Sequence, residues 1–160
     1  MSHTHLPSFD APDSLTHMSA TNPLSDLSPS RIADLQQRAI AAAQNAYAPY
    51  SNFHVGAAVL LEGDAIVTGC NVENASYRLT TCAEQNAITA AVAFHGPAIR
   101  IRAIVIANLN NAASPPCGAC RQTILEFSTP NTLIFFPGQD SGIDKASIAD
   151  LLPAAFILNE

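Results

Sequence analysis

The sequence predicts an α/β fold in which a mixed sheet lies between layers of helices, an α/β/α three-layer sandwich. Two observations lead to this class. Apolar runs of strand length alternate along the chain with helical patterns, which is typical of sheets covered by helices. The first of these runs is apolar on both of its alternating faces, as expected for a strand that is covered on both sides.

One domain accounts for the length of the chain. Its 160 residues are 48% hydrophobic, which is enough for a single core. Residues 1–29 differ from the rest because Ser, Thr, Pro, His and Asp dominate there, so we expect a mobile N-terminal tail followed by one globular domain over residues 30–160. His3, His5 and His17 are interpreted as solvated tail residues rather than metal ligands.

Charge and hydropathy argue against two classes of partner. Seven Lys and Arg against thirteen Asp and Glu give a formal net charge of -6, so there is no basic surface for a polynucleotide. No stretch reaches the roughly 18 consecutive apolar residues of a membrane span, and residues 1–30 lack a signal-peptide pattern. We therefore expect a soluble, cytoplasmic protein with neither a nucleic-acid nor a membrane partner.

The first predicted element is a helix. Ser28 suits the N-cap and Pro29 suits the first helical position. Pro49 is expected to end the helix. The apolar face of this helix would consist of Ile32, Leu35, Ala39, Ala42 and Ala46.

A hairpin is predicted next. Residues 53–61 and 65–70 are apolar runs separated by Glu62-Gly63-Asp64, which is a turn signal. In the first run Ala58 and Leu60 point to the side opposite the other apolar residues, so both faces are covered and the strand belongs in the middle of a sheet.

The second half of the chain alternates helices with strands. Helical patterns over residues 81–94 and 117–127 precede strand patterns over residues 99–107 and 132–136, respectively. A last short helix near residues 148–152 is expected to end at Pro153 and to leave an apolar C-terminal segment.

Residues with reactive or metal-binding side chains lie at the predicted starts of two helices. Cys82-Ala83-Glu84 opens one helix and Pro116-Cys117-Gly118-Ala119-Cys120 opens the other. If these starts lie side by side, three thiolates and one carboxylate converge. Helix N-termini lower the pKa of thiols, and three protein ligands leave the fourth position of a tetrahedral Zn²⁺ open, as in catalytic zinc sites.

Each piece also has a simpler interpretation. Residues 81–84 fit a capping box in which Glu84 only caps its own helix, and for this tetrapeptide alone that interpretation is favoured. Cys117 and Cys120 alone fit a thioredoxin-like redox pair, which leaves Cys82 unexplained. Cys70 could complete a four-cysteine structural site, but only one close Cys pair is present, so Cys70 is interpreted as a buried small apolar residue.

The complete set resembles the zinc-dependent cytidine deaminase family, whose signature is a His or Cys followed by x-Glu and later by Pro-Cys-x-x-Cys. The resemblance covers nearly all of residues 30–158. Its other motifs are Ala48-Pro49-Tyr50-Ser51-Asn52-Phe53 with Val55-Gly56-Ala57, Gly69-Cys70-Asn71-Val72-Glu73-Asn74-Ala75-Ser76-Tyr77, and Leu151-Leu152-Pro153 with Phe156. A Cys at position 82 and the short chain resemble the homotetrameric branch of the family, which acts on free nucleosides.

This resemblance implies a reaction and its catalytic groups. Cys82, Cys117 and Cys120 would hold Zn²⁺, and Glu84 would shuttle protons while water attacks C4 of cytosine. The expected reaction is the deamination of cytidine or 2'-deoxycytidine to uridine or 2'-deoxyuridine and ammonia, a step of pyrimidine salvage.

The resemblance also implies substrate contacts. Asn71 and Glu73 would bind the ribose 3'-OH, and Phe53 would face the pyrimidine ring, with Tyr77 on the same wall. Phe156 would reach into the site of a neighbouring subunit, so that the homotetramer shares its active sites. His54 and His95 match no ligand position of the family and are assigned structural or surface roles.

One position departs from the family pattern. The branch usually has Cys-Ala-Glu-Arg, and this chain has Gln85 instead of the Arg. Because Gln offers hydrogen bonds but no charge to three thiolates, Gln85 is interpreted as a charge deficit that Arg121 or the helix termini would compensate. Two alternatives stay open, a catalytically degenerate zinc-binding protein and a deaminase of another aminated nucleoside. Asn71 and Glu73 argue against the second because they provide for a ribose.

Overall fold

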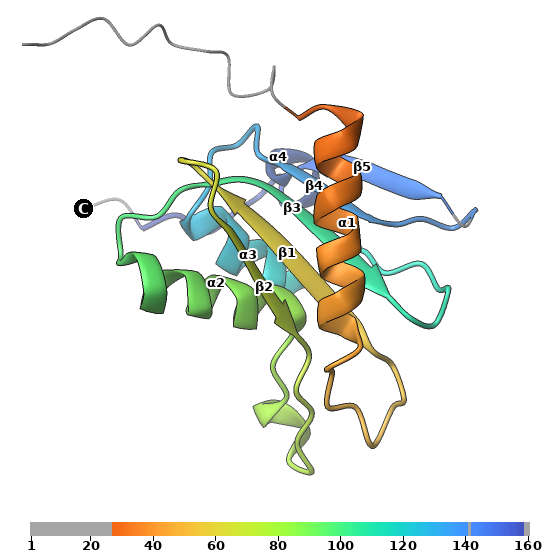
Figure 1. The fold of residues 1–160 in the computed structure, drawn as a ribbon. Coiled ribbons are helices and arrows are strands. Elements are labelled where there is room, and N and C mark those ends of the chain that lie inside the picture. The colour runs from red at the N-terminus through yellow and green to blue at the C-terminus, as the bar shows by residue number, and fades with distance from the viewer. Residues whose placement is uncertain (1–26, 141, 159–160) are drawn as a thin grey trace, which may run out of the picture.

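The computed structural model describes residues 27–140 and 142–158 (Figure 1). The predicted tail therefore lies outside the described residues, except for its last residues from 27 onward. Its three histidines also lie outside them. The domain boundary at residues 29 and 30 stays a prediction. In the part of the chain that the structure describes, no helix is long and apolar enough to cross a membrane.

The centre of the molecule is a five-stranded mixed sheet with the order β2-β1-β3-β4-β5. β3 and β4 run parallel, and the other neighbouring pairs are antiparallel. The predicted mixed sheet is thus confirmed. Its strands are β1 (Val55–Leu61), β2 (Ile66–Cys70), β3 (Ile101–Asn108), β4 (Leu133–Pro137) and β5 (Ile143–Ser147).

Helices cover both faces of the sheet (Figure 1). α1 (Pro29–Ala43) packs on one face, while α2 (Ala83–His95) and α3 (Gly118–Glu126) lie on the other with the short α4 (Ile148–Leu151). A 3-10 turn, η1 (Tyr77–Leu79), interrupts the loop between β2 and α2. The predicted three-layer sandwich is confirmed.

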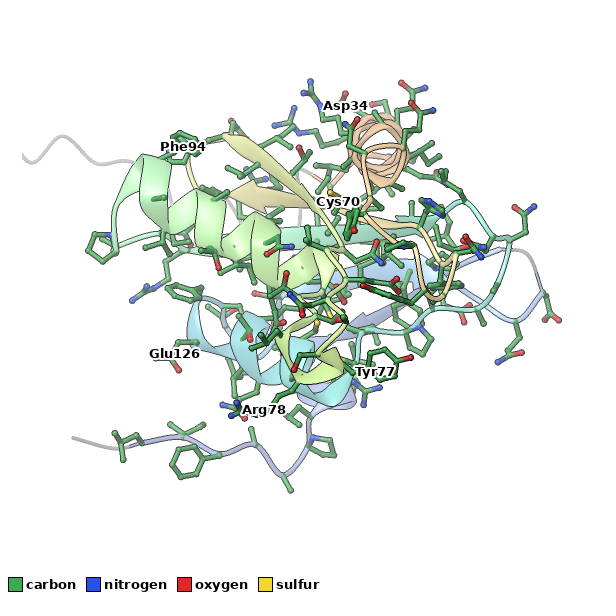
Figure 2. The ribbon with its side chains drawn as sticks, turned by 90° about the horizontal axis from the view of Figure 1, so that it is seen from below. Asp34, Cys70, Tyr77, Arg78, Phe94 and Glu126 are labelled. Atoms are coloured by element: carbon green, nitrogen blue, oxygen red, sulfur yellow. The ribbon has the colours of Figure 1, made fainter. Side chains whose placement is uncertain are left out.

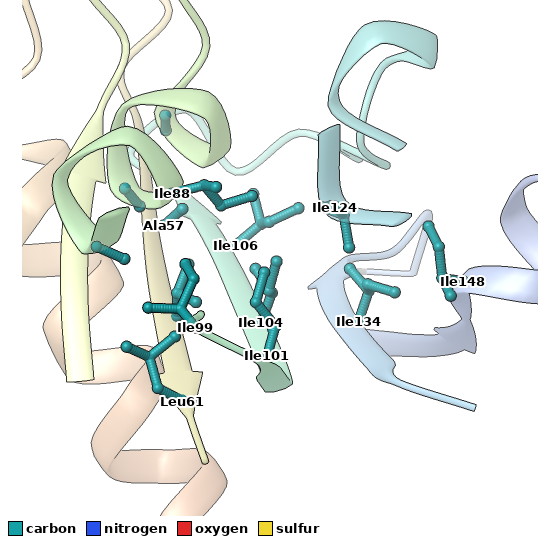
Figure 3. Close-up of a cluster of buried hydrophobic side chains, with 14 of the residues drawn as sticks. Ala57, Leu61, Ile88, Ile99, Ile101, Ile104, Ile106, Ile124, Ile134 and Ile148 are labelled. Atoms are coloured by element: carbon teal, nitrogen blue, oxygen red, sulfur yellow. The ribbon is translucent and has the colours of Figure 1, made fainter. Parts of the chain in front are cut away.

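The two faces of β1 belong to two different cores, as its alternating apolar residues predict. Ala58 and Leu60 pack with α1, in the same core as Leu35. Ala57 and Val59 pack on the side of α2 and α3. Figure 3 shows this core with Ala57 labelled. β1 and β2 form the predicted hairpin, with Gly63 (φ 84°) and Asp64 (φ 69°) in left-handed conformations in its turn.

α1 begins as predicted and ends earlier than predicted. Ser28 is the N-cap, and its Oγ accepts a hydrogen bond from the N–H of Arg31 at 3.2 Å. The helix ends at Ala43, six residues before Pro49. The chain must leave the helix there because Tyr47 pairs with the segment after β2, its N–H donating to the carbonyl of Asn71 at 3.1 Å.

Two glycines let helices lie directly on the sheet. A Cβ at Gly56 would come within 2.0 Å of the carbonyl oxygen of Ala39 in α1. At Gly69 it would come within 2.4 Å of the backbone nitrogen of Ala87 in α2. The second approach matters for function, because α2 begins beside the cysteines discussed next.

Candidate active site

The starts of α2 and α3 lie side by side on the same face of the sheet (Figure 1). Cys82 is the N-cap of α2, and Cys117 is the N-cap of α3. The Sγ of Cys117 accepts a hydrogen bond from the N–H of Cys120 at 3.4 Å, so the first turn of α3 orients the thiol of Cys117. The predicted convergence of the two helix starts is confirmed.

The three thiols have the spacing of a zinc site. The Sγ atoms of Cys82, Cys117 and Cys120 all lie within 4.8 Å of one another, and the Cys82 and Cys117 sulfurs are 3.9 Å apart. Tetrahedral coordination with Zn–S bonds of about 2.3 Å places two sulfurs about 3.8 Å apart. The three sulfurs are therefore close enough together to hold one Zn²⁺.

The pKa values of the thiols also indicate that the cluster would bind a cation. A hydrogen bond from Cys120 is the main cause that lowers the pKa of Cys82 to about 7. The same interaction, together with burial and the nearby carboxyl of Glu84, raises the pKa of Cys120 far above its usual value. Three thiolates cannot coexist here unaided, and a dication would stabilise them together.

Cys70 lies outside the cluster. It ends β2, opposite Gly56 in the register of the hairpin, and is half-buried rather than buried as predicted. Since the cluster joins Cys82 to Cys117 and Cys120, neither a four-cysteine site with Cys70 nor an isolated pair of cysteines describes the arrangement.

A cavity of about 330 Å³ opens in front of the cysteines. It brings together residues from the loop before β1, the segment after β2 and the starts of both helices. Of the residues predicted for the site, it is lined by Phe53, Asn71, Glu73, Cys82, Glu84 and Cys117.

Glu84 is a buried carboxyl in the wall of this cavity. It lies in the first turn of α2 with only 5% of its surface exposed. Burial raises its pKa, and hydrogen bonds with its own N–H and the Cys120 thiol offset part of that effect. The capping-box interpretation of Glu84 is wrong, because Gln85 supplies the side chain that accepts the N–H of Cys82, at 3.4 Å.

Asn71 orients the entrance to β1. Its Oδ1 accepts the N–H of Val55 at 2.8 Å, and its Nδ2 donates to the carbonyl of Phe53 at 2.8 Å. One amide hydrogen of Asn71 remains for a ligand in the cavity. The same two bonds fix Phe53 at the cavity wall.

Glu73 is held by the loop that precedes β1. Its carboxylate accepts the N–H groups of Tyr50 and Ser51 at 2.9 and 3.2 Å and the hydroxyl of Ser51. These hydrogen bonds, above all the one from the Ser51 hydroxyl, lower the pKa of Glu73. An ionised acceptor therefore faces the cavity, two residues from Asn71 as predicted.

Tyr77 does not share this wall. The η1 turn directs the chain outward, and Tyr77 is 78% exposed (Figure 2). It borders a neighbouring hollow of about 410 Å³, where its ring meets that of Tyr50 at a centroid distance of 6.4 Å. The expected position of Tyr77 is thus corrected, although Glu73 and Thr80 border both hollows.

Phe156 also lies away from the cavity of its own chain. Its side chain is 71% exposed, and its carbonyl accepts a hydrogen bond from Gln122 at 2.9 Å. The role expected for it in a neighbouring subunit stays a prediction.

Arg121 holds the backbone next to Cys117 through hydrogen bonds to two carbonyl groups. Its guanidinium donates to the carbonyls of Pro116 and Leu151, both at 2.8 Å. Its expected compensation of thiolate charge stays a prediction. The two histidines lie apart from the thiols, since His54 contacts the carbonyl of Asn52 at 3.1 Å and His95 is exposed in the last turn of α2.

Several lining residues were not predicted. Among them are the hydroxyl residues Ser51, Thr80, Thr81 and Ser114. Ser51 lies within a stretch already noted for its resemblance to the family, so the sequence could have predicted its place at the cavity. The place of Ser114 could not be predicted, because it depends on a long-range bond from its N–H to the carbonyl of Pro137.

Three thiols at two helix starts, beside a buried carboxyl in an open cavity, define an α/β protein with a zinc site of the catalytic type. Residues 29–136 match the family model described as the cytidine and deoxycytidylate deaminase zinc-binding region. The chain belongs to this family.

Curated relatives agree with the family model. A cytidine deaminase of Halalkalibacterium halodurans is 39% identical over 122 residues, which cover 76% of this chain and 91% of that one. A cytidine deaminase of Sporosarcina psychrophila is 42% identical over 115 residues, covering 72% of this chain and 83% of that one.

Solved structures show the same fold. The cytidine deaminase of Burkholderia pseudomallei has a TM-score of 0.70 and 41% identity, covering 78% of this chain and 98% of that one. For the cytidine deaminase of Mycobacterium tuberculosis the TM-score is 0.69 and the identity 41%, with coverage of 79% and 97%.

Proposed function

We propose that this chain is a zinc-dependent aminohydrolase that converts cytidine or 2'-deoxycytidine into uridine or 2'-deoxyuridine and ammonia. One observation carries the proposal. The buried carboxyl of Glu84 and the cluster of Cys82, Cys117 and Cys120 meet in a single cavity whose other side presents Asn71 and Glu73. Relatives that share about two-fifths of the sequence are cytidine deaminases.

The three cysteines would hold the metal. When bound, Zn²⁺ supplies Lewis acidity that makes water nucleophilic near neutral pH. Glu84 accepts a proton from the attacking water and passes it to N3 of cytosine as the new C4–O bond forms. A second transfer through the same carboxyl delivers the hydroxyl proton to the amino group, the C4–N bond breaks, and ammonia leaves. The raised pKa of Glu84 suits a group that must both accept and donate protons.

The opposite end of the cavity would hold the sugar. The ionised Glu73 accepts a hydrogen bond from a ribose hydroxyl, and the remaining amide hydrogen of Asn71 donates to the same hydroxyl. Phe53 offers an apolar surface to the pyrimidine. A carboxylate in this position disfavours a phosphate nearby, which supports a free nucleoside as the substrate.

We infer a homotetramer in which Phe156 completes the site of a neighbouring subunit. The strongly exposed side chains of Phe156, Ile157 and Leu158 support such a contact. We also infer a role in pyrimidine salvage, because the proposed reaction turns one pyrimidine nucleoside into another, and we place this role in the cytoplasm.

Loss of the ultraviolet absorbance of cytidine, with release of ammonia, tests the proposal directly. Glu84→Gln should retain zinc and nucleoside binding while turnover falls by at least about 100-fold, because an amide cannot shuttle the proton. Normal turnover by Glu84→Gln would remove this carboxyl from the mechanism.

Two other functions predict different assay results. A degenerate family member would bind zinc but would deaminate no nucleoside. A deaminase of another aminated nucleoside would leave cytidine intact and act on a different base, and a panel of aminated nucleosides with the same absorbance readout separates these outcomes.

A further inference from the structure

Gln85 connects the two helices that carry the cysteines. Its Oε1 accepts the N–H of Cys82 at 3.4 Å, and its Nε2 donates to the Oγ1 of Thr123 at 3.5 Å. The hydroxyl of Thr123 in turn donates to the carbonyl of Ala119 at 2.9 Å. A chain of hydrogen bonds thus runs from the backbone of Cys82 to the backbone between Cys117 and Cys120.

These hydrogen bonds connect the two parts of the cysteine cluster, so they influence the distances between its sulfur atoms. Cys82 is the only cysteine of the cluster at the start of α2, and the other two belong to the start of α3. The bond from Gln85 to Thr123 crosses from the first turn of α2 to the second turn of α3, and it adds to the contacts that the cysteines and Glu84 make between the two helix starts. A change in this bond therefore alters the separation between one sulfur and the other two.

The chemistry of glutamine is matched to both ends of the connection. Its amide has an acceptor for the N–H of Cys82 and a donor for the hydroxyl of Thr123, whereas arginine has donors only. Both side chains are half-buried, where hydrogen bonds are less weakened by water than at the surface. Gln85 therefore has a hydrogen-bonding role here, and its interpretation as a charge deficit stays a prediction.

We propose that Gln85 and Thr123 form a neutral clamp that sets the distance of Cys82 from Cys117 and Cys120 and thereby slows the release of zinc. Gln85 is a positioning residue, since it acts through Cys82. The proposal rests on the proposed zinc dependence of the protein, and its readout is metal retention rather than turnover.

The test measures zinc release from the purified holoprotein into excess chromogenic chelator. Thr123→Val removes the hydroxyl while preserving the shape of the side chain, and Gln85→Met removes the amide from the opposite end. Both variants should release zinc about 10-fold faster, the lower end of the range for groups that orient metal ligands. The double variant should be no faster than Gln85→Met alone, because both substitutions break one connection.

Matched variants isolate the clamp. Thr123→Ser keeps the hydroxyl and should release zinc within about twofold of the wild-type rate, whereas the clamp variants approach the tenfold change. Thr89→Val makes the same substitution at an exposed position of α2 and should have no effect. In Co²⁺-substituted protein, the thiolate-to-metal charge-transfer bands should shift for Gln85→Met and not for Thr89→Val.

Wild-type release rates in both Thr123→Val and Gln85→Met, in proteins that bind one zinc each, would overturn the clamp and leave the proposed function intact. Wild-type protein that holds no zinc would overturn both proposals. If one of the two variants fails to fold, the other decides, because each removes the same bond.

Discussion

At the scale of single residues, Cys82 and Glu84 show how neighbouring groups acquire opposite acidities. They are two positions apart at the start of α2, yet the pKa of Cys82 is lowered and that of Glu84 is raised. A hydrogen bond from Cys120 stabilises the Cys82 thiolate, while burial destabilises the Glu84 carboxylate. The same helix start thus supplies an anionic metal ligand and a carboxyl that retains a proton more readily.

The composition of the cluster predicts which cysteines zinc requires. Purified wild-type protein should contain about one zinc per chain, because three protein ligands form one site. Cys117→Ser should lose most of this metal, while Cys70→Ser should retain it, since Cys70 lies outside the cluster. Elemental analysis after dialysis gives the answer, and metal loss in Cys70→Ser would show that the ligand set is wrong.

Glu73 predicts a pH-dependent contribution to stability. Its pKa is lowered in the folded protein, so its ionised form stabilises the fold above the unfolded-state pKa of about 4.3. That contribution is lost as the pH falls through the lower, folded-state pKa. Glu73→Gln should therefore melt below wild type at about pH 7, and the difference should shrink at about pH 3.

Glu126→Gln is the control for this measurement, because Glu126 is exposed at the end of α3 (Figure 2). Its melting temperature should differ little from that of wild type across the same range. A difference between wild type and Glu73→Gln that grows on acidification would contradict the hydrogen-bonded role of Glu73. Since Glu73 also faces the cavity, the KM for cytidine should rise in the same variant.

Sequence alone identified the cysteines and the carboxyl that gather at the site better than the residues that surround them. Cysteines and carboxylates such as Cys82 and Glu84 can be recognised in a sequence, because their chemistry is specific and they occur at the spacing of a known motif. The bond between Gln85 and Thr123 was not predicted, because the two residues are 38 positions apart and the bond depends on how two helices pack. Tyr77 was misplaced for a similar reason, since a local 3-10 turn decides its direction.

At the scale of elements, periodicity predicted the structure wherever a face is buried. The apolar alternation of β1 and the patterns of α2 and α3 were sufficient to assign these elements to a layered fold. β5 escaped prediction because it is an edge strand whose sequence, Ile-Asp-Lys-Ala-Ser, is mostly exposed. The predicted end of α1 was wrong, because the pairing of Tyr47 with the segment after β2, rather than Pro49, ends the helix.

The contact between β2 and α2 predicts an effect on both stability and activity. A Cβ at Gly69 would lie 2.4 Å from the nitrogen of Ala87 and 2.7 Å from the oxygen of Ala83. Gly69→Ala must therefore displace α2, at a cost of about 1–3 kcal/mol in the free energy of unfolding. Because α2 carries Cys82 and Glu84, kcat/KM should fall on the order of 10- to 100-fold.

Gly142→Ala provides the comparison, since a Cβ there meets nothing within 4 Å. Denaturant unfolding and steady-state kinetics should both leave this variant close to wild type. If Gly69→Ala were equally harmless, α2 would not be held at the distance on which the site depends.

At the scale of the whole molecule, the C-terminal segment is apolar and unusually exposed. Phe156, Ile157 and Leu158 show 71%, 65% and 77% of their surface, although the backbone of Phe156 is anchored by Gln122. Side chains of this kind are costly in water unless another surface covers them. A neighbouring subunit would cover them and would explain why no aromatic ring of this segment lines the cavity of its own chain.

The resulting prediction is that active sites are shared. Phe156→Ala should lower kcat/KM for cytidine about 2- to 13-fold, because stacking on the base contributes about 0.5 to 1.5 kcal/mol beyond burial. Phe94→Ala makes the same change at a side chain that is 81% exposed at the far end of α2, and it should leave the kinetics unchanged.

Subunit mixing separates a shared site from a local effect of Phe156. Glu84→Gln subunits keep Phe156 but lack the proton shuttle, whereas Phe156→Ala subunits keep Glu84. In mixed oligomers, some sites combine an intact Glu84 with an intact Phe156 from the neighbour, so activity should rise above the sum of the two separate preparations. Sedimentation should show an oligomer throughout. A fully active monomer, or mixed preparations without any gain, would mean that each chain completes its own site, and the exposed C-terminal segment would then need another explanation.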